Sequence, residues 1–223
     1  FDLLGINSLQ LTSGGLRHGL LMDMLGQNQH HSDLRTHSVE RLAAKFGADP
    51  VHGKRVGQVA SVLLERLCTN MPQSDAGALA QMQERLLWAG QLHEIGSHIS
   101  HSDYHKHGAY ILDNTDAMGF ALTELHHLSL LVLGHRGKLR KLDVDFCDEV
   151  FVQKLRLAVV LCHARNDPDL QGLALSRDSK IANRFVLVCP KGWAQAFPQS
   201  AHLLNEESVA WQKTPWSLTV QGC

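Results

Sequence analysis

Apolar residues recur at spacings of three and four along most of this chain, and this helical period constrains the fold more than any other feature. Polar or proline-containing connections such as Asp49-Pro50 and Met71-Pro72 separate the periodic segments. We therefore expect a mainly α-helical bundle. The expected helices cover Gly15–Leu25, Ser38–Phe46, Gly53–Leu67, Ala76–Leu92, Ala109–Asn114, Thr123–Leu133 and Phe146–His163.

The pattern changes after Asn166-Asp167-Pro168. Arg184–Val188 and Trp216–Val220 are rich in residues that favour strands, and the segment between them contains a helical stretch, Ser200–Gln212. This order predicts a small β-α-β unit at the end of the chain. The fold class is therefore mainly α, and α+β overall.

The composition supplies enough apolar residues for a hydrophobic core. Of its 223 residues, 44% are hydrophobic and 19% are charged, and the formal net charge is -1. This balance gives no global attraction for nucleic acid or for a membrane surface. No apolar run approaches the roughly 18 residues that a membrane span needs, so we expect neither a nucleic-acid partner nor a membrane span.

The cysteines indicate the redox environment. All five are widely spaced and form no C-x-x-C pair, which argues against a disulfide framework and against a zinc-thiolate cluster. A reducing, cytoplasmic location is expected. The chain starts with Phe1 and without a signal peptide, so it is expected to be a piece of a longer protein.

The chemistry is expected around Leu86–Tyr110, where five histidines fall within residues 93–107. An apolar helical run delivers His93 and Glu94 to its end, and a histidine followed by a carboxylate can bind a metal or organise a phosphate site. His52 lies one helical turn before Val56 on an apolar face, so its imidazole could point toward His93. His52, His93 and Glu94 are the candidate metal ligands.

This arrangement resembles the start of an HD domain, the helical phosphohydrolase fold named for its metal-binding His-Asp pair. His52 stands at the first histidine position, and His93-Glu94 stands where His-Asp is expected. The distal aspartate of that family falls at Val159, which cannot bind a metal ion. Because hard cations prefer several oxygen ligands, we expect no metal here and interpret His93 as a hydrogen-bonded core histidine.

The whole chain resembles the C-terminal part of the exopolyphosphatase and guanosine pentaphosphate phosphatase family. The segment Ser13–Leu25, SGGLRHGLLMDML, is similar to the family's junction helix, with His18 where glutamate is common. The remaining matches follow in the family's order: Ser38-Val39, Leu42, Leu86–Gly96, Ile99–Ser102, Tyr104–His107, Tyr110–Leu112, Gly134–Arg136, Leu155–Ala158 and Gly192-Trp193.

The resemblance implies three parts. Residues 1–30 would be the end of an actin-like phosphatase domain with a junction helix, 31–168 a degenerate HD-like helical domain, and 169–223 the β-α-β unit. The full protein would use Mg²⁺ and a water to remove the terminal phosphate of inorganic polyphosphate, or the 5'-phosphate of guanosine pentaphosphate. The Mg²⁺ and the catalytic residues would belong mainly to the actin-like domain, which this chain lacks.

By the same resemblance this chain alone would be inactive and would need no cofactor. It would bind the polyanion, contact its own N-terminal actin-like domain, form a homodimer, or combine these roles. An autonomous HD-type metal-dependent phosphohydrolase and a purely structural dimerisation unit remain as alternatives. The tryptophans are expected to pack inside the protein, because basic and aromatic residues do not interleave as in single-strand binding.

A phosphate chain would be held by clustered cationic donors. Residues 135–141, HRGKLRK, form the densest basic patch, although a solvated loop is an equal interpretation. Residues 100–107 either place donors at a helix N-terminus or form a helix start capped by Ser102 or Asp103. Arg17 fits an ion pair at the hinge better than a substrate contact. The candidate phosphate-binding residues are Arg17, His101, His105, Lys106, His107, His135, Arg136 and Lys138.

Overall fold

The structure is a computed structural model that describes residues 34–68, 76–138, 149–178, 181 and 183–222. The expected helix Gly15–Leu25 and the candidate residue Arg17 lie outside these ranges. Within them, no helix combines the length and the apolar character that crossing a bilayer requires.

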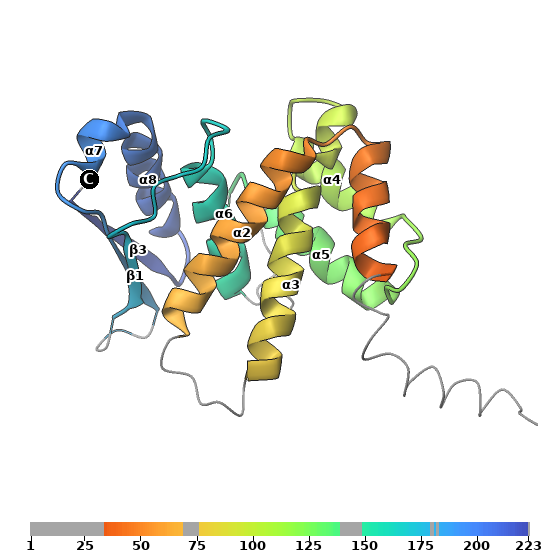
Figure 1. The fold of residues 1–223 in the computed structure, drawn as a ribbon, viewed down its shortest axis with the longest axis horizontal. Helices are drawn as coiled ribbons and strands as arrows, with labels where there is room; N and C mark the ends of the chain where they lie inside the picture. The colour runs from red at the N-terminus through yellow and green to blue at the C-terminus, as the bar shows by residue number, and fades with distance from the viewer. Residues whose placement is uncertain (1–33, 69–75, 139–148, 179–180, 182, 223) are drawn as a thin grey trace, which may run out of the picture.

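The described helices form a bundle, with a small β-α unit at one end of it (Figure 1). The mainly α, α+β prediction is confirmed. The bundle comprises a helix over residues 34–45, α2 (Pro50–Leu67), α3 (Ala76–Leu92), α4 (Tyr104–Asp113), α5 (Leu122–Gly134) and α6 (Glu149–Leu161), with the short 3-10 helix η3 (Ile95–His98) between α3 and α4. The terminal unit comprises β1 (Ala174–Arg177), β2 (Arg184–Val188), α7 (Trp193–Ala196), α8 (Pro198–Trp211) and β3 (Ser217–Gln221).

Local signals explain where α2 begins. The Asp49 carboxylate accepts hydrogen bonds from the backbone N–H groups of Val51, at 2.9 Å, and His52, at 3.1 Å. Pro50 occupies the first turn, where its missing N–H costs nothing. The Asp49-Pro50 step does open this helix, which begins three residues before the expected Gly53.

The start of α4 differs from the expectation. Asp103 precedes the helix with a φ of 55° and makes no capping hydrogen bond. Its carboxylate instead accepts a hydrogen bond from Lys106 Nζ at 2.7 Å. The alternative interpretation, a helix start capped by Ser102 or Asp103, is wrong, because the left-handed backbone and the lysine take the aspartate away from the helix N-terminus.

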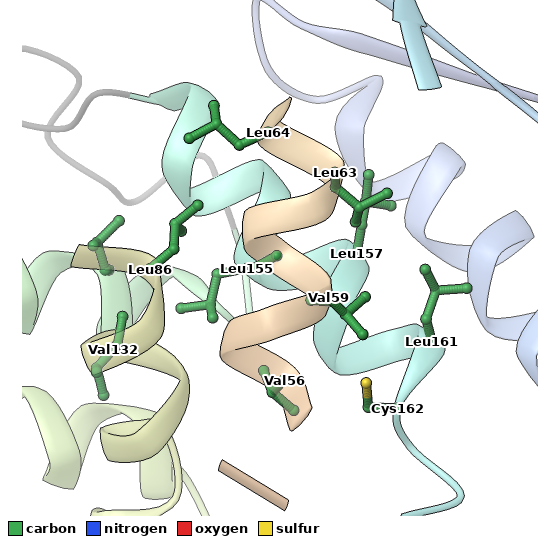
Figure 2. Close-up of a cluster of buried hydrophobic side chains, with 14 of the residues drawn as sticks. Val56, Val59, Leu63, Leu64, Leu86, Val132, Leu155, Leu157, Leu161 and Cys162 are labelled. Atoms are coloured by element: carbon green, nitrogen blue, oxygen red, sulfur yellow. The ribbon is translucent and has the colours of Figure 1, made fainter. Parts of the chain in front are cut away.

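Helix α2 is the centre of the core. It packs between α3 and α6, and its Val56, Val59 and Leu63 face the buried side chains of the neighbouring helices (Figure 2). Leu157 of α6 is fully buried in the same cluster. Burying a side chain of this size stabilises the fold by about 1.5–3 kcal/mol.

Three glycines bring the backbones of α2 and α3 into contact. A Cβ atom added to Gly90 would lie 2.4 Å from the backbone nitrogen of Gly57, and one added to Gly53 would lie 2.8 Å from the Cα atom of Gln91. These separations are far below van der Waals contact, so no side chain fits between the two helices. The axial positions of α2 and α3 are therefore fixed by residues without side chains.

The terminal unit contains the expected β-α-β motif and one further strand. β2 and β3 are parallel, with Phe185 beside Leu218, and α8 forms the connection between them. β1 pairs antiparallel with the other edge of β2. The sequence did not predict β1, because its four residues bury only Leu175 and show no usable alternation.

Cys189 is disulfide-bonded, whereas Cys68 and Cys162 are free thiols. The cysteine spacing argued against a disulfide framework, but Cys189 does form a disulfide. This residue follows β2 directly, and its N–H donates to the carbonyl of Gln221 at 2.8 Å. Sheet pairing, which cysteine spacing does not reveal, thus places Cys189 beside the end of β3.

A buried ion pair joins the terminal unit to the bundle. The guanidinium of Arg156, on α6, binds both carboxylate oxygens of Glu207, on α8, and the Nη2 to Oε2 distance is 2.7 Å. Arg156 Nη1 also donates to the carbonyls of Gly134 and Gly137, at 3.0 and 3.2 Å. Trp211 Nε1 donates to Glu207 at 2.7 Å. Both buried charges are therefore paired and hydrogen-bonded, as burial requires.

Replacing Gly90 with alanine is expected to reduce the free energy of unfolding by about 3 kcal/mol or more, because the new methyl group has no space against Gly57. Gly77→Ala is the control on the same helix. Nothing lies within 4 Å of a Cβ at that position, so the change should be neutral or stabilising by up to about 1 kcal/mol. Urea unfolding followed by circular dichroism measures both values, and equal effects would contradict the close helix contact.

Replacing Glu207 with alanine is expected to cost about 3–5 kcal/mol, because the Arg156 charge would stay buried without its partner. The adjacent Glu206 is exposed and faces His202, so Glu206→Ala should change stability by less than about 0.5 kcal/mol. Thermal unfolding of the two variants compares them directly. A small effect at Glu207 would show that the pair does not hold the two parts together.

Candidate functional site

Two buried histidines face each other where α2 and α3 meet. His52 lies in the first turn of α2, and His93 comes directly after α3. Their exposed fractions are 4% and 2%, and their ring centroids are 5.5 Å apart. The structure therefore brings together the two imidazoles that the sequence predicted to be neighbours.

The hydrogen bonds of His93 define which of its nitrogens is free. Its Nδ1 lies 2.6 Å from the carbonyl of Gly90, and since a carbonyl only accepts, Nδ1 donates. The lone pair of the neutral ring is then on Nε2. His52 Nε2 lies 4.0 Å from Glu94 Oε1. One ligand atom from each of His52, His93 and Glu94 can be chosen so that all lie within 4.8 Å of one another.

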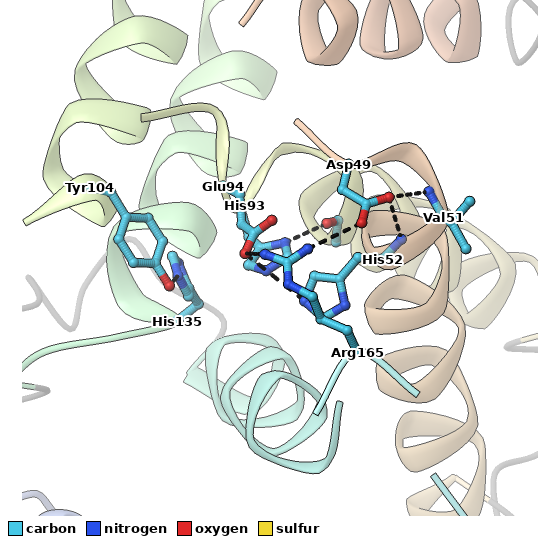
Figure 3. Close-up of polar contacts among 9 residues, drawn as sticks. Asp49, Val51, His52, His93, Glu94, Tyr104, His135 and Arg165 are labelled. Carbon is cyan, nitrogen blue, oxygen red and sulfur yellow. Dashed lines mark hydrogen bonds and ion pairs between the residues drawn. The ribbon is translucent and has the colours of Figure 1, made fainter. Parts of the chain in front are cut away.

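Arg165 completes this site, and the sequence gave no signal for it. Its guanidinium lies between two carboxylates (Figure 3): Nη2 is 2.8 Å from Glu94 Oε1, and Nη1 is 3.1 Å from Asp49 Oδ2. Arg165 follows α6 in a polar turn, with a φ of 58°, and its backbone N–H donates to the carbonyl oxygen of Cys162 at 2.9 Å. Arg165 lies in a turn and is far in sequence from Asp49 and Glu94, so no sequence pattern indicates that it contacts them.

The residues present do not fit a magnesium ion. Mg²⁺ favours about six oxygen ligands, whereas this group offers two imidazole nitrogens and one carboxylate. The single carboxylate already binds Arg165. Val159 lies on α6 and packs against the hydrophobic core. Among the described residues, no other histidine, cysteine and carboxylate group has metal-binding geometry.

The row of histidines continues through the bundle. His135, just after α5, lies 5.3 Å from His93 and 6.3 Å from His105, measured between ring centroids. Its Nδ1 donates to the carbonyl of Val132 at 2.5 Å, and its Nε2 lies 3.3 Å from the Tyr104 hydroxyl. His105 Nδ1 is buried without a hydrogen-bond partner. The row links the first turn of α2 to the first turn of α4.

A pocket of about 290 Å³ opens beside this row. Glu94 and Tyr104 belong both to the pocket and to the surroundings of the histidines. The residues that line it are Gly47, Asp49, Glu94, Ser97, His101, Tyr104 and Arg165. Its wall therefore carries two carboxylates, one guanidinium and one exposed imidazole.

Burial keeps the histidines of the row uncharged at neutral pH. It lowers the pKa of His135 well below the usual range, and the neighbouring His93 adds to this effect. Burial also lowers the pKa of His93 and of His52, although the Glu94 carboxylate partly opposes it in both cases. In contrast, the backbone N–H of His52 lowers the pKa of Asp49, helped by Val51 and Arg165, so this carboxylate stays charged.

Comparison with known proteins identifies the chain's relatives. The family model described as Ppx/GppA phosphatase, domain III, matches residues 34–208. This chain belongs to the Ppx/GppA phosphatase family.

Curated members of the Ppx/GppA family match almost the whole chain. It is 32% identical to the guanosine-5'-triphosphate,3'-diphosphate pyrophosphatase of Pseudoalteromonas atlantica, and 30% identical to that of Pseudoalteromonas translucida, over 99% of its length. The corresponding protein of Photobacterium profundum is 29% identical. The chain spans 44% of the length of each of these relatives.

The structure separates the predicted phosphate-binding residues of this Ppx/GppA chain into two sets. His105 and His135 are buried, and His107 is half-buried. His101, Lys106, Arg136 and Lys138 are exposed near the start of α4 and the end of α5. The guanidinium of Arg136 lies 5.1 Å from the centroid of the Tyr104 ring. Only the second set is available to a ligand at the surface.

Acidification is expected to destabilise the chain. The pKa of His135 is lower in the folded state than in the unfolded chain, so below about pH 6.5 the unfolded state binds the extra proton. The stabilisation from the neutral imidazole should be fully present above this pH. The free energy of unfolding should fall as the pH drops below it, by up to about 1.4 kcal/mol per pH unit for each such imidazole.

His135→Gln should reduce this pH slope by the share of one imidazole. The control is His202→Gln, which removes an exposed imidazole from α8 and should leave the slope unchanged. Urea unfolding at several pH values measures how the free energy of unfolding of each variant changes with pH. The same slope in His135→Gln and in the wild type would contradict a neutral, buried His135.

Proposed function

We propose that this chain is the C-terminal module of a phosphatase that removes the 5'-phosphate of guanosine pentaphosphate, and that the module binds the anionic substrate. The names of the curated relatives support the nucleotide as substrate. Inorganic polyphosphate is the alternative, because it presents a similar row of phosphate oxygens.

One observation carries the binding role: exposed basic side chains lie close to Tyr104 in the sequence or, for Arg136, over its ring. We call this group the Tyr104 surface and define it as His101, Tyr104, Lys106, Arg136 and Lys138. It combines residues from the start of α4 with residues that follow α5. A linear polyanion needs several donors along its length, and this surface supplies them beside the 290 Å³ pocket.

The geometry at Arg136 favours phosphate recognition. Contact with the Tyr104 ring restrains the guanidinium at 5.1 Å from the ring centroid, so its planar fork loses little freedom when it binds two oxygens. Lys106 pairs with Asp103, but both side chains are more than half exposed. Such an exposed pair is weak, and a phosphate can replace the carboxylate at little cost.

Hydrolysis would depend on residues outside this chain. We propose that the Mg²⁺, the phosphate loops and the catalytic base belong to an actin-like domain, in the part of the relatives that this chain does not cover. The module would hold the far end of the substrate while that domain acts on the terminal phosphate. A homodimer and a cytoplasmic location remain predictions, and the molar mass in solution checks the former.

The second candidate is an autonomous metal-dependent phosphohydrolase. The proximity of His52, His93 and Glu94 favours it. However, the ion pair between Arg165 and Glu94 uses the only carboxylate of that group. We therefore prefer the binding module.

Fluorescently labelled polyphosphate and guanosine pentaphosphate are the probes for this proposal, with affinity measured by anisotropy. The double variant Lys106→Ala, Arg136→Ala is expected to weaken binding at least about tenfold, because it removes two charged donors. Binding should also weaken with added salt.

A matched double variant, Lys45→Ala, Lys213→Ala, removes the same net charge from two exposed positions outside the Tyr104 surface and should bind like the wild type. Equal losses in both double variants would contradict the specific surface. Release of phosphate by this chain alone with a divalent metal would favour the second candidate.

A further inference from the structure

The His52, His93 and Glu94 group has the ligand types of a transition-metal site. Two imidazoles and one carboxylate form a common protein site for Zn²⁺, with a fourth position open to water. Here His93 is oriented by its hydrogen bond to Gly90, which leaves Nε2 free for a ligand role. The adjoining pocket shares Glu94 with the group, so solvent can reach it.

Arg165 uses the oxygen that such a site would need. Glu94 Oε1 is the atom that faces His52 Nε2, at 4.0 Å, and the same oxygen binds Arg165 Nη2 at 2.8 Å. A divalent cation among these three ligands would lie a few ångströms from the guanidinium. Like charges at this separation repel strongly, even with the screening of a partly exposed site.

The position of Arg165 is determined by several independent contacts. Its second guanidinium nitrogen binds Asp49 Oδ2 at 3.1 Å, so carboxylates from two different elements hold the group (Figure 3). Its backbone has a φ of 58°, and its backbone N–H donates to the carbonyl oxygen of Cys162 at 2.9 Å. Non-glycine residues rarely adopt this backbone conformation, which the surrounding structure must therefore stabilise.

We propose that Arg165 is a built-in cation that takes the place of a divalent metal ion at His52, His93 and Glu94. The native chain excludes metals from this group. Neutralising the guanidinium alone exposes a binding site for Zn²⁺ or Co²⁺, formed by the two imidazoles and the freed carboxylate. The proposal does not rest on the phosphate-binding role, because it concerns the metal alone.

The required rearrangement is small. Ligand atoms around a tetrahedral Zn²⁺ lie about 3.3 Å apart, whereas these atoms lie within 4.8 Å of one another. The side chain of Glu94 is unbranched and partly exposed, so it can swing toward the imidazoles once Arg165 releases it. Asp49 would add a second negative charge at the rim of the site.

Zn²⁺ titration by calorimetry and Co²⁺ absorption spectra test this proposal on the full chain. Arg165→Gln removes the charge at similar size and is expected to bind one Zn²⁺ at least about 100-fold more tightly than the wild type. Arg165→Lys keeps the charge and should resemble the wild type. The double variant Arg165→Gln, His93→Ala should lose the gained affinity.

His126→Ala in the Arg165→Gln background is the matched control. His126 is exposed and pairs with Asp113 away from the group, so the gained site should remain. Arg165→Gly suits the positive φ and repeats the test with a second neutral residue.

Three outcomes would overturn the proposal. These are tight binding of one Zn²⁺ by the wild type, no gain in either neutral variant that circular dichroism shows to be folded, or a gain that survives His93→Ala. None of them bears on phosphate binding, which is measured without metal at the Tyr104 surface.

Discussion

The backbone contact between α2 and α3 determines the geometry of everything that follows. Gly53 and Gly57 on one helix and Gly90 on the other leave no room for side chains between them. His52 immediately precedes this contact, and His93 follows it by less than one turn, so the two imidazoles must meet. The carbonyl of Gly90 then accepts the Nδ1 hydrogen of His93 and orients its ring. A wider separation of the helices would place the same residues out of reach of each other.

Electrostatics divide the site into an uncharged interior and a charged rim. Burial favours the neutral forms of His52, His93 and His135, because a charged imidazole would lose its hydration. The attraction of Glu94 opposes this effect only partly at His52 and His93. At the rim, one guanidinium neutralises carboxylates from two elements. The interior therefore offers no charge to an anion, and recognition of phosphate is left to the exposed residues around Tyr104. This division explains why a histidine-rich segment need not be a catalytic one.

The sequence was sufficient for features that depend on local period and local hydrogen bonds. The bounds of α3, the start of α2 at Asp49 and the β-α-β motif follow from apolar spacing and from capping residues. It also predicted that His52 would approach His93, because both lie on apolar faces. It did not predict β1, the pairing of Cys189 or the role of Arg165. Each of these depends on contacts between distant segments, where a short strand, a cysteine or a turn arginine carries no pattern of its own. For the same reason it did not distinguish the buried His105 and His135 from the exposed Arg136.

The terminal β-α unit contributes to the site although none of its described residues lies in it. Arg156 donates to the carbonyls of Gly134 and Gly137, which flank His135 and Arg136, and Glu207 on α8 holds Arg156 in place. A Cβ at Gly137 would lie 2.8 Å from His105 Nε2, so the same turn also closes over the first turn of α4. The position of Arg136 over Tyr104 thus depends on the buried ion pair between Arg156 in the helical bundle and Glu207 in the terminal β-α unit. If the module binds phosphate through Arg136, the β-α unit stabilises that surface, because the ion pair between Glu207 and Arg156 holds the turn that carries Arg136.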